Sequence, residues 1–304
     1  MSQSTSDISL SVELPEDDSE QGIIGDLMAL TKARLSMLVV ITTFVGYCMG
    51  TVGSIDWLRL LHAVLGTAMA AAAAAVLNQV FEVNVDRLME RTRHRPLPAG
   101  RMRRRTALAL GAGLAVTGVG YLWLAVNGIS AFLAAATVVI YLFIYTPLKR
   151  RTPFCITVGA IAGAIPPVIG WMAARPTADL GAWVLFGILF TWQMPHFLAI
   201  AWMYRDEYAH AGFVMLKRDD ISGSSTALQS LAYTLALSTI SLAAYTGGMN
   251  SVAYMVGAFL LNAVMMVFAV QFLFQRERAS ARRLFFASIL FLPLLLGLMV
   301  FTKS

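Results

Sequence analysis

Three oxygen-bearing side chains, Asn78, Glu82 and Asp86, recur at four-residue intervals at the end of a long apolar stretch. In an α-helix each step of four residues rotates the position by only about 40°, so the three side chains share one face over two turns. Carboxylate and amide oxygens suit a hard cation such as Mg²⁺, which in proteins also binds the phosphate oxygens of substrates. The spacing predicts a metal and phosphate site, and a polar helix end that meets lipid headgroups is the alternative.

A second acidic segment, YRDEYAHAG, follows a later apolar stretch. It has Asp206 and His210 at the same four-residue interval, with Glu207 and Tyr208 between them. Taken alone, this pair is equally consistent with an ordinary polar loop. Charged groups at the ends of membrane helices are costly unless they act or reach water. If it lies opposite the first three side chains, this segment forms a second metal-binding edge.

Basic residues accompany both acidic segments. The sequence RTRHRPLP contains Arg91 and Arg95, and TPLKRR contains Lys149 and Arg150. Arginine binds phosphate through paired hydrogen bonds and lysine acts as a point charge, so these residues are candidates to bind a diphosphate. For Lys149 and Arg150, anchoring of a membrane helix at the lipid surface explains the charge equally well.

The composition indicates which kind of fold must position these residues. Of the 304 residues, 58% are hydrophobic and 13% are charged, and the mean hydropathy is +0.69. Such values are typical of an integral membrane protein, whose helices need about 20 apolar residues to cross the hydrocarbon core. We therefore predict an all-α bundle of transmembrane helices. The nine expected helices cover residues 28–50, 57–80, 106–125, 129–146, 154–173, 181–200, 226–247, 251–274 and 284–301.

The distribution of Lys and Arg predicts the orientation of this bundle. With the N-terminus in the cytoplasm, 20 of the 23 basic residues fall in cytoplasmic segments, and Arg59, Arg175 and Lys303 are the exceptions. This asymmetry follows the positive-inside rule. The C-terminus is then expected outside, and both acidic segments lie at the cytoplasmic face, where a shared cavity would open. The net charge of +6 thus reflects topology and gives no reason to expect nucleic-acid binding.

The N-terminal residues 1–26 have a different composition from the rest. They carry seven acids and no Lys or Arg, which excludes a secretory signal and favours a disordered tail before a single membrane domain at 27–304. The two cysteines, Cys48 and Cys155, lie in or beside apolar stretches and imply no disulfide.

Acids, a metal ion and cations at the mouth of an apolar bundle favour one kind of chemistry. A lipid-soluble chain with a diphosphate head would place its tail between the helices and its head at the mouth. The metal ion and the basic residues would neutralise the leaving diphosphate. A dry cavity lined by aromatic rings would protect the allylic carbocation until an acceptor attacked it.

Several longer motifs resemble the intramembrane polyprenyl diphosphate transferases and, among these, the heme O synthase (protoheme IX farnesyltransferase) family. They span residues of about 30 to 217 and read LTKARLSMLVVITTFVG, MERTRHRPLPAG, YTPLKRRTPF, GAIAGAIPPVIGW and WQMPHFLAIAWMYRDEYAHAGFVML. The resemblance implies transfer of farnesyl from farnesyl diphosphate to a vinyl group of heme B, with addition of water and release of diphosphate. It also implies a Mg²⁺ requirement and a role in the heme biosynthesis of terminal oxidases, in the inner membrane.

The resemblance also implies roles for particular residues. The first catalytic and metal-binding motif of the family matches Asn78, Glu82 and Asp86. The second motif matches Asp206, Glu207 and Tyr208, where Asp206 and Tyr208 are expected to be catalytic and Asp206 and Glu207 to bind the metal. The basic loop of the family matches Lys149 and Arg150. Ala33, Cys155 and the segment FVMLKRDD depart from the family pattern, so no function is expected of Lys217 or Arg218.

His196 is the candidate to bind heme. It follows Pro195 within an apolar helix, and a neutral imidazole there would ligate the iron or hydrogen-bond a propionate, unless it only makes a contact within the bundle. Heme B, farnesyl diphosphate and membrane lipid are the expected partners, and heme A synthase or oxidase assembly proteins are further candidates. A prenyltransferase for another aromatic or macrocyclic acceptor and a multi-pass transporter are the alternatives.

Overall fold

The computed structural model describes residues 22–304. The predicted disordered tail, 1–26, therefore lies mostly outside the described residues. Its last residues do not, because a helix begins at Ile23. In this helix Asp26 is buried and forms an ion pair with Arg101, with 3.0 Å between Oδ1 and Nε.

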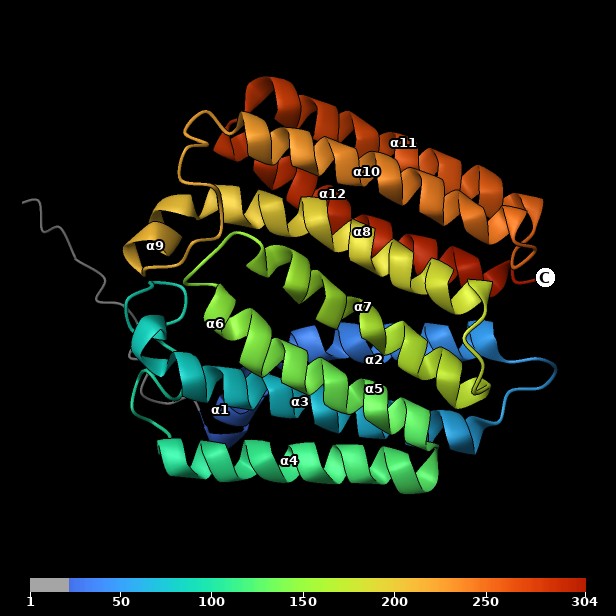
Figure 1. The fold of residues 1–304 in the computed structure, drawn as a ribbon, viewed down its shortest axis with the longest axis horizontal. Helices are drawn as coiled ribbons and strands as arrows, with labels where there is room; N and C mark the ends of the chain where they lie inside the picture. The colour runs from blue at the N-terminus through green and yellow to red at the C-terminus, as the bar shows by residue number, and fades with distance from the viewer. Residues whose placement is uncertain (1–21) are drawn as a thin grey trace, which may run out of the picture.

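Residues 22–304 form helices and loops without a β-strand, so the predicted all-α class is confirmed (Figure 1). The helices are α1 (Ile23–Leu30), α2 (Ala33–Gly50), α3 (Trp57–Asp86), α4 (Arg104–Ala125), α5 (Gly128–Val139), α6 (Thr146–Leu148), α7 (Cys155–Ala174), α8 (Leu180–Met203), α9 (Arg205–His210), α10 (Ser224–Thr246), α11 (Val252–Gln275) and α12 (Arg278–Phe301).

Eight helical spans in the described chain are long and apolar enough to cross a membrane. They agree with eight of the nine expected spans to within a few residues. The second and the last expected spans are exceptions, because the helices there are about two turns longer than expected. The expected first span, 28–50, is not continuous. It consists of α1 and α2, which are bent by 57° relative to each other and count as a ninth span if taken together. Lys32 lies at the bend in the left-handed conformation, with φ of 48°.

The side chain of Gln79 on α3 stabilises this bend. Its Nε2 atom donates hydrogen bonds to the carbonyl oxygens of Ala29 at 3.1 Å and Leu30 at 2.7 Å. The last carbonyl groups of a helix have no partner within the helix, so such donors satisfy the end of α1. The bend thus depends on a residue almost fifty positions away.

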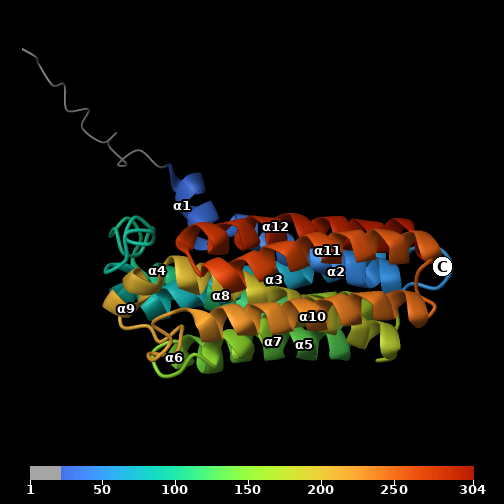
Figure 2. The same ribbon diagram turned by 90° about the horizontal axis from the view of Figure 1, so that it is seen from above.

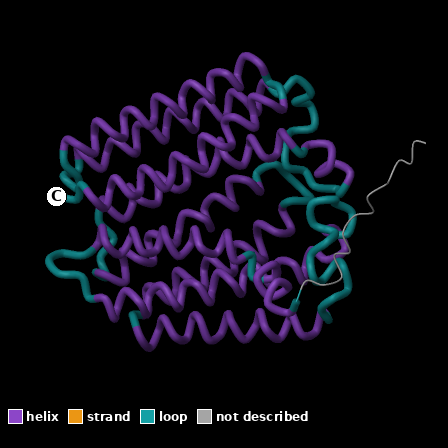
Figure 3. The backbone as a smooth tube through the Cα atoms, turned by 180° about the vertical axis from the view of Figure 1, so that it is seen from behind, coloured by secondary structure: helices purple, strands orange, loops and turns teal. Residues whose placement is uncertain are grey.

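The long helices run along one common direction, and α1 projects from one end of the bundle (Figure 2). Seen from behind, the loops gather at the two ends, and the larger group lies opposite the C-terminus (Figure 3). Small residues set the closest contacts in the bundle. A Cβ atom on Gly170 of α7 would lie only 1.9 Å from the carbonyl oxygen of Thr43 on α2. This close approach is typical of helices that pack within lipid.

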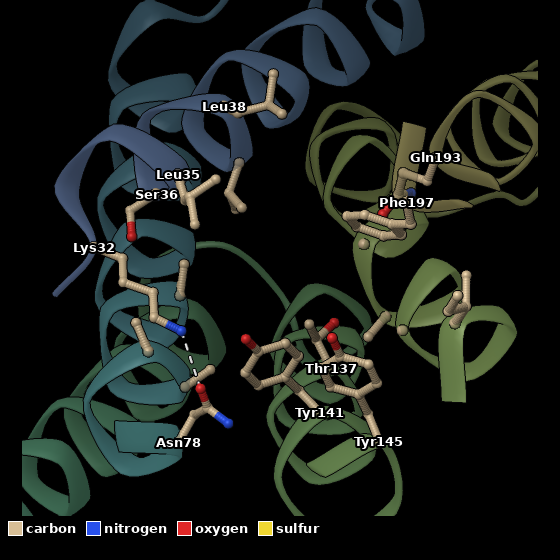
Figure 4. Close-up of a pocket in the computed structure, with 18 of the residues that line it drawn as sticks. Lys32, Leu35, Ser36, Leu38, Asn78, Thr137, Tyr141, Tyr145, Gln193 and Phe197 are labelled. Atoms are coloured by element: carbon tan, nitrogen blue, oxygen red, sulfur yellow. Dashed lines mark hydrogen bonds between the residues drawn. The ribbon is translucent and has the colours of Figure 1, made fainter. Parts of the chain in front are cut away.

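A π-helical segment, Ile140–Tyr145, joins α5 to α6 within one continuous span. Pro147 follows it and has no N–H group to continue the α-helical hydrogen-bond pattern. The Thr146 hydroxyl donates to the carbonyl oxygen of Tyr141 at 2.8 Å. In Figure 4, Tyr141 and Tyr145 both point into the cavity described below.

Candidate active site

A cavity of about 430 Å³ lies between α2, α3, α5 to α6, α7 and α8. Its lining is mostly apolar, and its charged residues gather at one end. At that end, Lys32 reaches from the bend between α1 and α2 toward Asn78 on α3, with Tyr141 across the cavity (Figure 4). The loops 87–103 and 149–154 lie at the same end of the bundle (Figure 1). The cavity thus has a polar mouth and an apolar interior.

The three predicted side chains of α3 share one buried face at this mouth. Asn78, Glu82 and Asp86 are 0%, 6% and 1% exposed, and all three line the cavity. The Asn78 amide donates to Glu82 Oε2 at 2.9 Å and to Thr146 Oγ1 at 3.1 Å. This arrangement leaves Asn78 Oδ1 free to accept a hydrogen bond from Lys32 Nζ at 3.0 Å.

Glu82 forms a buried ion pair with Lys149. The Nζ atom of Lys149 lies 2.9 Å and 3.0 Å from the two carboxylate oxygens, and 4.7 Å from the centre of the Tyr145 ring. Burial by itself lowers the pKa of Lys149, but Tyr145 and the Glu82 carboxylate outweigh it and raise the pKa above its ordinary value. Lys149 therefore carries a positive charge at the mouth.

Asp86 is paired with the loop that follows α3. Its Oδ2 atom lies 2.8 Å from Arg95 Nη1, and its backbone carbonyl accepts a hydrogen bond from the Thr92 hydroxyl at 2.8 Å. Arg95 and Arg91 both line the cavity. Each oxygen-bearing side chain of α3 thus has its own basic partner, and a negatively charged ligand can interact with the same cations.

The second acidic segment is only partly brought to this mouth. Tyr208 lines the cavity, and its hydroxyl accepts a hydrogen bond from Arg91 Nη2 at 3.3 Å. Glu207 accepts one from the Arg91 backbone N–H at 3.3 Å and so joins α9 to the loop after α3. The Asp206 side chain, in contrast, is 97% exposed and lies 3.7 Å from Arg205.

Asp206 and Arg150 line a neighbouring hollow of about 630 Å³ and not the cavity beside α3. The five predicted metal ligands are therefore not gathered, and residues 22–304 contain no group of three or more His, Cys, Asp and Glu side chains suited to a metal ion. The reason is local: α9 is six residues long, and its first turn faces water. The side chains suited to hold Mg²⁺ are Asn78, Glu82 and Asp86, with water and phosphate oxygens as the remaining ligands.

His196 lies deeper in the cavity, on α8. Its ring stacks with Trp192, at 5.1 Å between ring centres, and with Phe285 of α12, at 4.9 Å. Its Nδ1 atom lies 2.7 Å from Ser288 Oγ. The predicted heme-binding residue is thus separated along the cavity from the predicted diphosphate-binding residues.

Three residues at the mouth were not singled out from the sequence. Lys32 counted only toward topology, and Tyr141 and Tyr145 belonged to an ordinary apolar span. The spacing of these residues in the sequence does not indicate that they face the cavity. They turn inward because residue 32 is left-handed and because residues 140–145 form a π-helical segment. The one available signal is Pro147, whose missing N–H favours a local change of helix type.

Comparison with known proteins shows the family of the chain. The profile of the UbiA prenyltransferase family matches residues 39–292, so the chain belongs to this family. The chain is 44% identical over 287 residues to the protoheme IX farnesyltransferase of Solibacter usitatus, which covers 91% of this chain and 98% of that protein. It is 42% identical over 280 residues to the protoheme IX farnesyltransferase of Opitutus terrae, covering 91% and 94%. The resemblance noted in the motifs is thereby confirmed.

Solved structures agree on the fold. A structure of digeranylgeranylglyceryl phosphate synthase superposes with a TM-score of 0.77 at 14% identity, over 92% of this chain and 98% of that chain. A UbiA homologue from Archaeoglobus fulgidus, bound to DMAPP and Mg²⁺, superposes with a TM-score of 0.64 at 12% identity, over 90% and 99%. The chain is therefore a multi-pass membrane prenyltransferase.

Proposed function

We propose that this prenyltransferase transfers farnesyl from farnesyl diphosphate to a vinyl group of heme B, with addition of water, and forms heme O and diphosphate. The observation that carries the proposal is a cavity with a cationic mouth and a largely apolar interior, which His196 lines. Protoheme IX farnesyltransferases with more than 40% identity support the choice of substrates.

The diphosphate group is expected to bind at the mouth. Lys32, Arg91, Arg95 and Lys149 supply positive charge there, and Arg95 and Arg91 can bind phosphate oxygens in pairs. Asn78, Glu82 and Asp86 would hold Mg²⁺, which supplies further charge to neutralise the leaving group. Tyr208 would add a hydroxyl donor beside Arg91. The exposed Asp206 and Arg150 are left out of this site as proposed.

The reaction breaks the bond between C1 of the farnesyl chain and the diphosphate oxygen, and the diphosphate leaves with the electron pair. C1 then bonds to the terminal carbon of the vinyl group, which leaves a positive charge on the inner vinyl carbon. Water attacks that carbon and loses a proton. The Tyr141 and Tyr145 rings face the cavity and stabilise positive charge on the farnesyl chain through their π faces. The apolar walls keep other water from capturing this charge early.

The orientation in the membrane is also a proposal. The basic loops 87–105 and 149–151 lie at the end of the bundle where the cavity opens, which supports a cytoplasmic mouth and N-terminus, with the C-terminus outside. The charge bias bears on orientation alone, and the inner membrane is proposed from the resemblance noted in the motifs.

The test is incubation of the protein, purified in detergent, with heme B, farnesyl diphosphate and Mg²⁺, followed by mass measurement of the pigments. We expect a heme heavier by one farnesyl group and one water, no product with EDTA, and recovery when Mg²⁺ is restored. Prenylation of another aromatic acceptor in place of heme would indicate the same mechanism with a different acceptor. No prenyl transfer at all, with ion or solute flux in vesicles, would overturn the proposal.

A further inference from the structure

The contact between α8 and α12 holds His196 in one orientation. Trp192 and Phe285 both stack on its ring, at interplanar angles of 21° and 28°. Trp192 is itself held, because its Nε1 atom donates to the backbone oxygen of Ser288 at 2.8 Å. The ring can therefore not turn without breaking these contacts. The ring also lines the cavity, where a ligand can meet it.

The hydrogen bonds of Ser288 determine which ring nitrogen carries the proton. The Ser288 hydroxyl has one hydrogen, which it donates to the backbone oxygen of Phe285 at 2.6 Å. The Phe285 carbonyl can only accept, so we assign the hydroxyl hydrogen to that bond. On this assignment Oγ, which lies 2.7 Å from His196 Nδ1, accepts a hydrogen bond from Nδ1. In a neutral imidazole the other nitrogen, Nε2, has a free electron pair. No residue of the described chain forms a hydrogen bond with Nε2.

We propose that His196 is an axial ligand of the heme iron through Nε2, and that Ser288 is the positioning residue that fixes this tautomer. The inference rests on the function proposed above. It decides between two roles for His196, because a bare Nε2 binds an electron-pair acceptor such as iron but cannot donate to a propionate oxygen. Histidines that bind metals commonly donate their second N–H to an oxygen in this way.

The proposal assigns a role to the last helix, whose sequence carries no recognisable motif. Ser288 is fully buried and Phe285 packs against the same ring, so α12 contributes to the acceptor end of the cavity. The diphosphate end, in contrast, is built by α3, α6 and the loops beside them. The two substrates are thus held by different helices.

The experiment is a titration of the purified full-length protein with ferric heme B, followed by absorption, and a parallel titration with metal-free protoporphyrin IX. We expect Ser288→Ala to weaken heme B binding by about tenfold and to shift the spectrum of the bound heme, since loss of a histidine's hydrogen-bond acceptor typically costs this much. Binding of protoporphyrin IX is expected to stay unchanged, because it has no iron. Ser288→Thr should retain the wild-type spectrum, and Ser288→Val should behave like Ser288→Ala.

Ser230→Ala is the matched control. Ser230 is also fully buried, but its hydroxyl donates only to the carbonyl oxygen of Thr226 on its own helix. Unchanged heme binding and spectrum in Ser288→Ala would overturn the proposal, as would an equal loss for both porphyrins, which indicates a change of shape.

A second measurement does not depend on the folding of variants at position 288. His196→Gly should lose the wild-type heme spectrum and regain it with added imidazole. An unchanged spectrum in His196→Gly, or no recovery with imidazole, would overturn the proposal. Failure of the proposed function would give a different result. In that case the wild-type protein would bind heme B with this spectrum but form no farnesylated heme.

Discussion

The two acidic segments carry the same kinds of side chains in opposite surroundings. At the end of α3, Glu82 and Asp86 are buried and each lies within 3 Å of a basic atom. On α9, Asp206 is 97% exposed, and its nearest basic partner is 3.7 Å away. A charge in water interacts weakly with its neighbours, whereas a buried charge interacts strongly and needs a partner. Burial, more than spacing, therefore separates the two segments.

The difference has its origin in helix length and in the loops that cover each segment. The buried acids Glu82 and Asp86 belong to a helix of 30 residues, and the loop 87–103 folds back so that Arg95 reaches Asp86. The second segment belongs to a helix of six residues at the rim, where Glu207 and Tyr208 turn inward and Asp206 turns outward. The second segment joins the mouth through two of its three predicted residues.

The largest effect on activity is expected at the buried acids of α3. Asp86→Asn removes a charge beside the leaving diphosphate, so the rate of prenyl transfer should fall by about 10²–10³-fold, as for loss of other preorganised charge-stabilising groups. Glu90→Gln is the matched control, since Glu90 continues the four-residue spacing in the sequence but lies beyond the end of α3, with a side chain that is 86% exposed. A loss of similar size in Glu90→Gln would show that burial does not distinguish these acids.

A smaller effect is expected for the basic partner of Glu82. Lys149→Met should lower activity by about 10–100-fold, because a hydrogen bond between charged groups contributes roughly 1.5–3 kcal/mol. It should also lower the free energy of unfolding, since the Glu82 carboxylate stays buried without a partner.

Two further variants test this explanation. The double variant Lys149→Met with Glu82→Gln should regain stability and stay inactive. Arg150→Met should retain both activity and stability, because Arg150 is exposed and lies outside the cavity. Loss of activity in Arg150→Met would return this residue to the diphosphate site.

Asp206→Asn tests the other side of the comparison. A solvated ion pair contributes no more than about 1 kcal/mol, so the prenyl transfer rate should fall by about fivefold at most. A loss as large as that of Asp86→Asn would show that α9 turns toward the cavity when the diphosphate binds. The comparison of the two segments would then hold only for the protein without substrate.

The smallest effect concerns stability near the second segment. Asp220 accepts hydrogen bonds from the backbone N–H groups of Ser225 at 3.0 Å and Thr226 at 2.8 Å, in the first turn of α10. Asp220→Ala should lower the free energy of unfolding by about 1 kcal/mol, as for loss of other helix caps, with little change in activity.

This stabilisation is expected to depend on pH. Burial raises the pKa of Asp220, but hydrogen bonds from the Thr226 side chain and from the backbone outweigh it and hold the pKa below its ordinary value. The carboxylate therefore stabilises the protein above the pKa of the unfolded state, and this stabilisation is lost as the pH falls through the lowered pKa. Thermal unfolding of wild type and Asp220→Ala should differ at neutral pH and converge in acid. A constant difference would assign the effect to packing.

Much of the fold could be predicted from the sequence, because hydropathy is a local property. Hydropathy places eight spans to within a few residues, although the second and last helices extend about two turns further. The four-residue spacing of Asn78, Glu82 and Asp86 indicates that they share one face of α3. The break at Lys32 could not be predicted, because it depends on Gln79, which is distant in the chain. The outward position of Asp206 was equally inaccessible, since its spacing resembles that of the buried acids of α3.

Residue types and their spacing were enough to indicate a membrane helix bundle, the face of α3 that carries Asn78, Glu82 and Asp86, and the enzyme family. The packing of distant helices was needed to show that each of these three side chains has its own basic partner and that Ser288 of α12 lies 2.7 Å from Nδ1 of His196. The physical reason is the range of the interactions. Apolar length and helical period act over neighbouring residues, whereas ion pairs and ring contacts depend on which faces of distant helices meet.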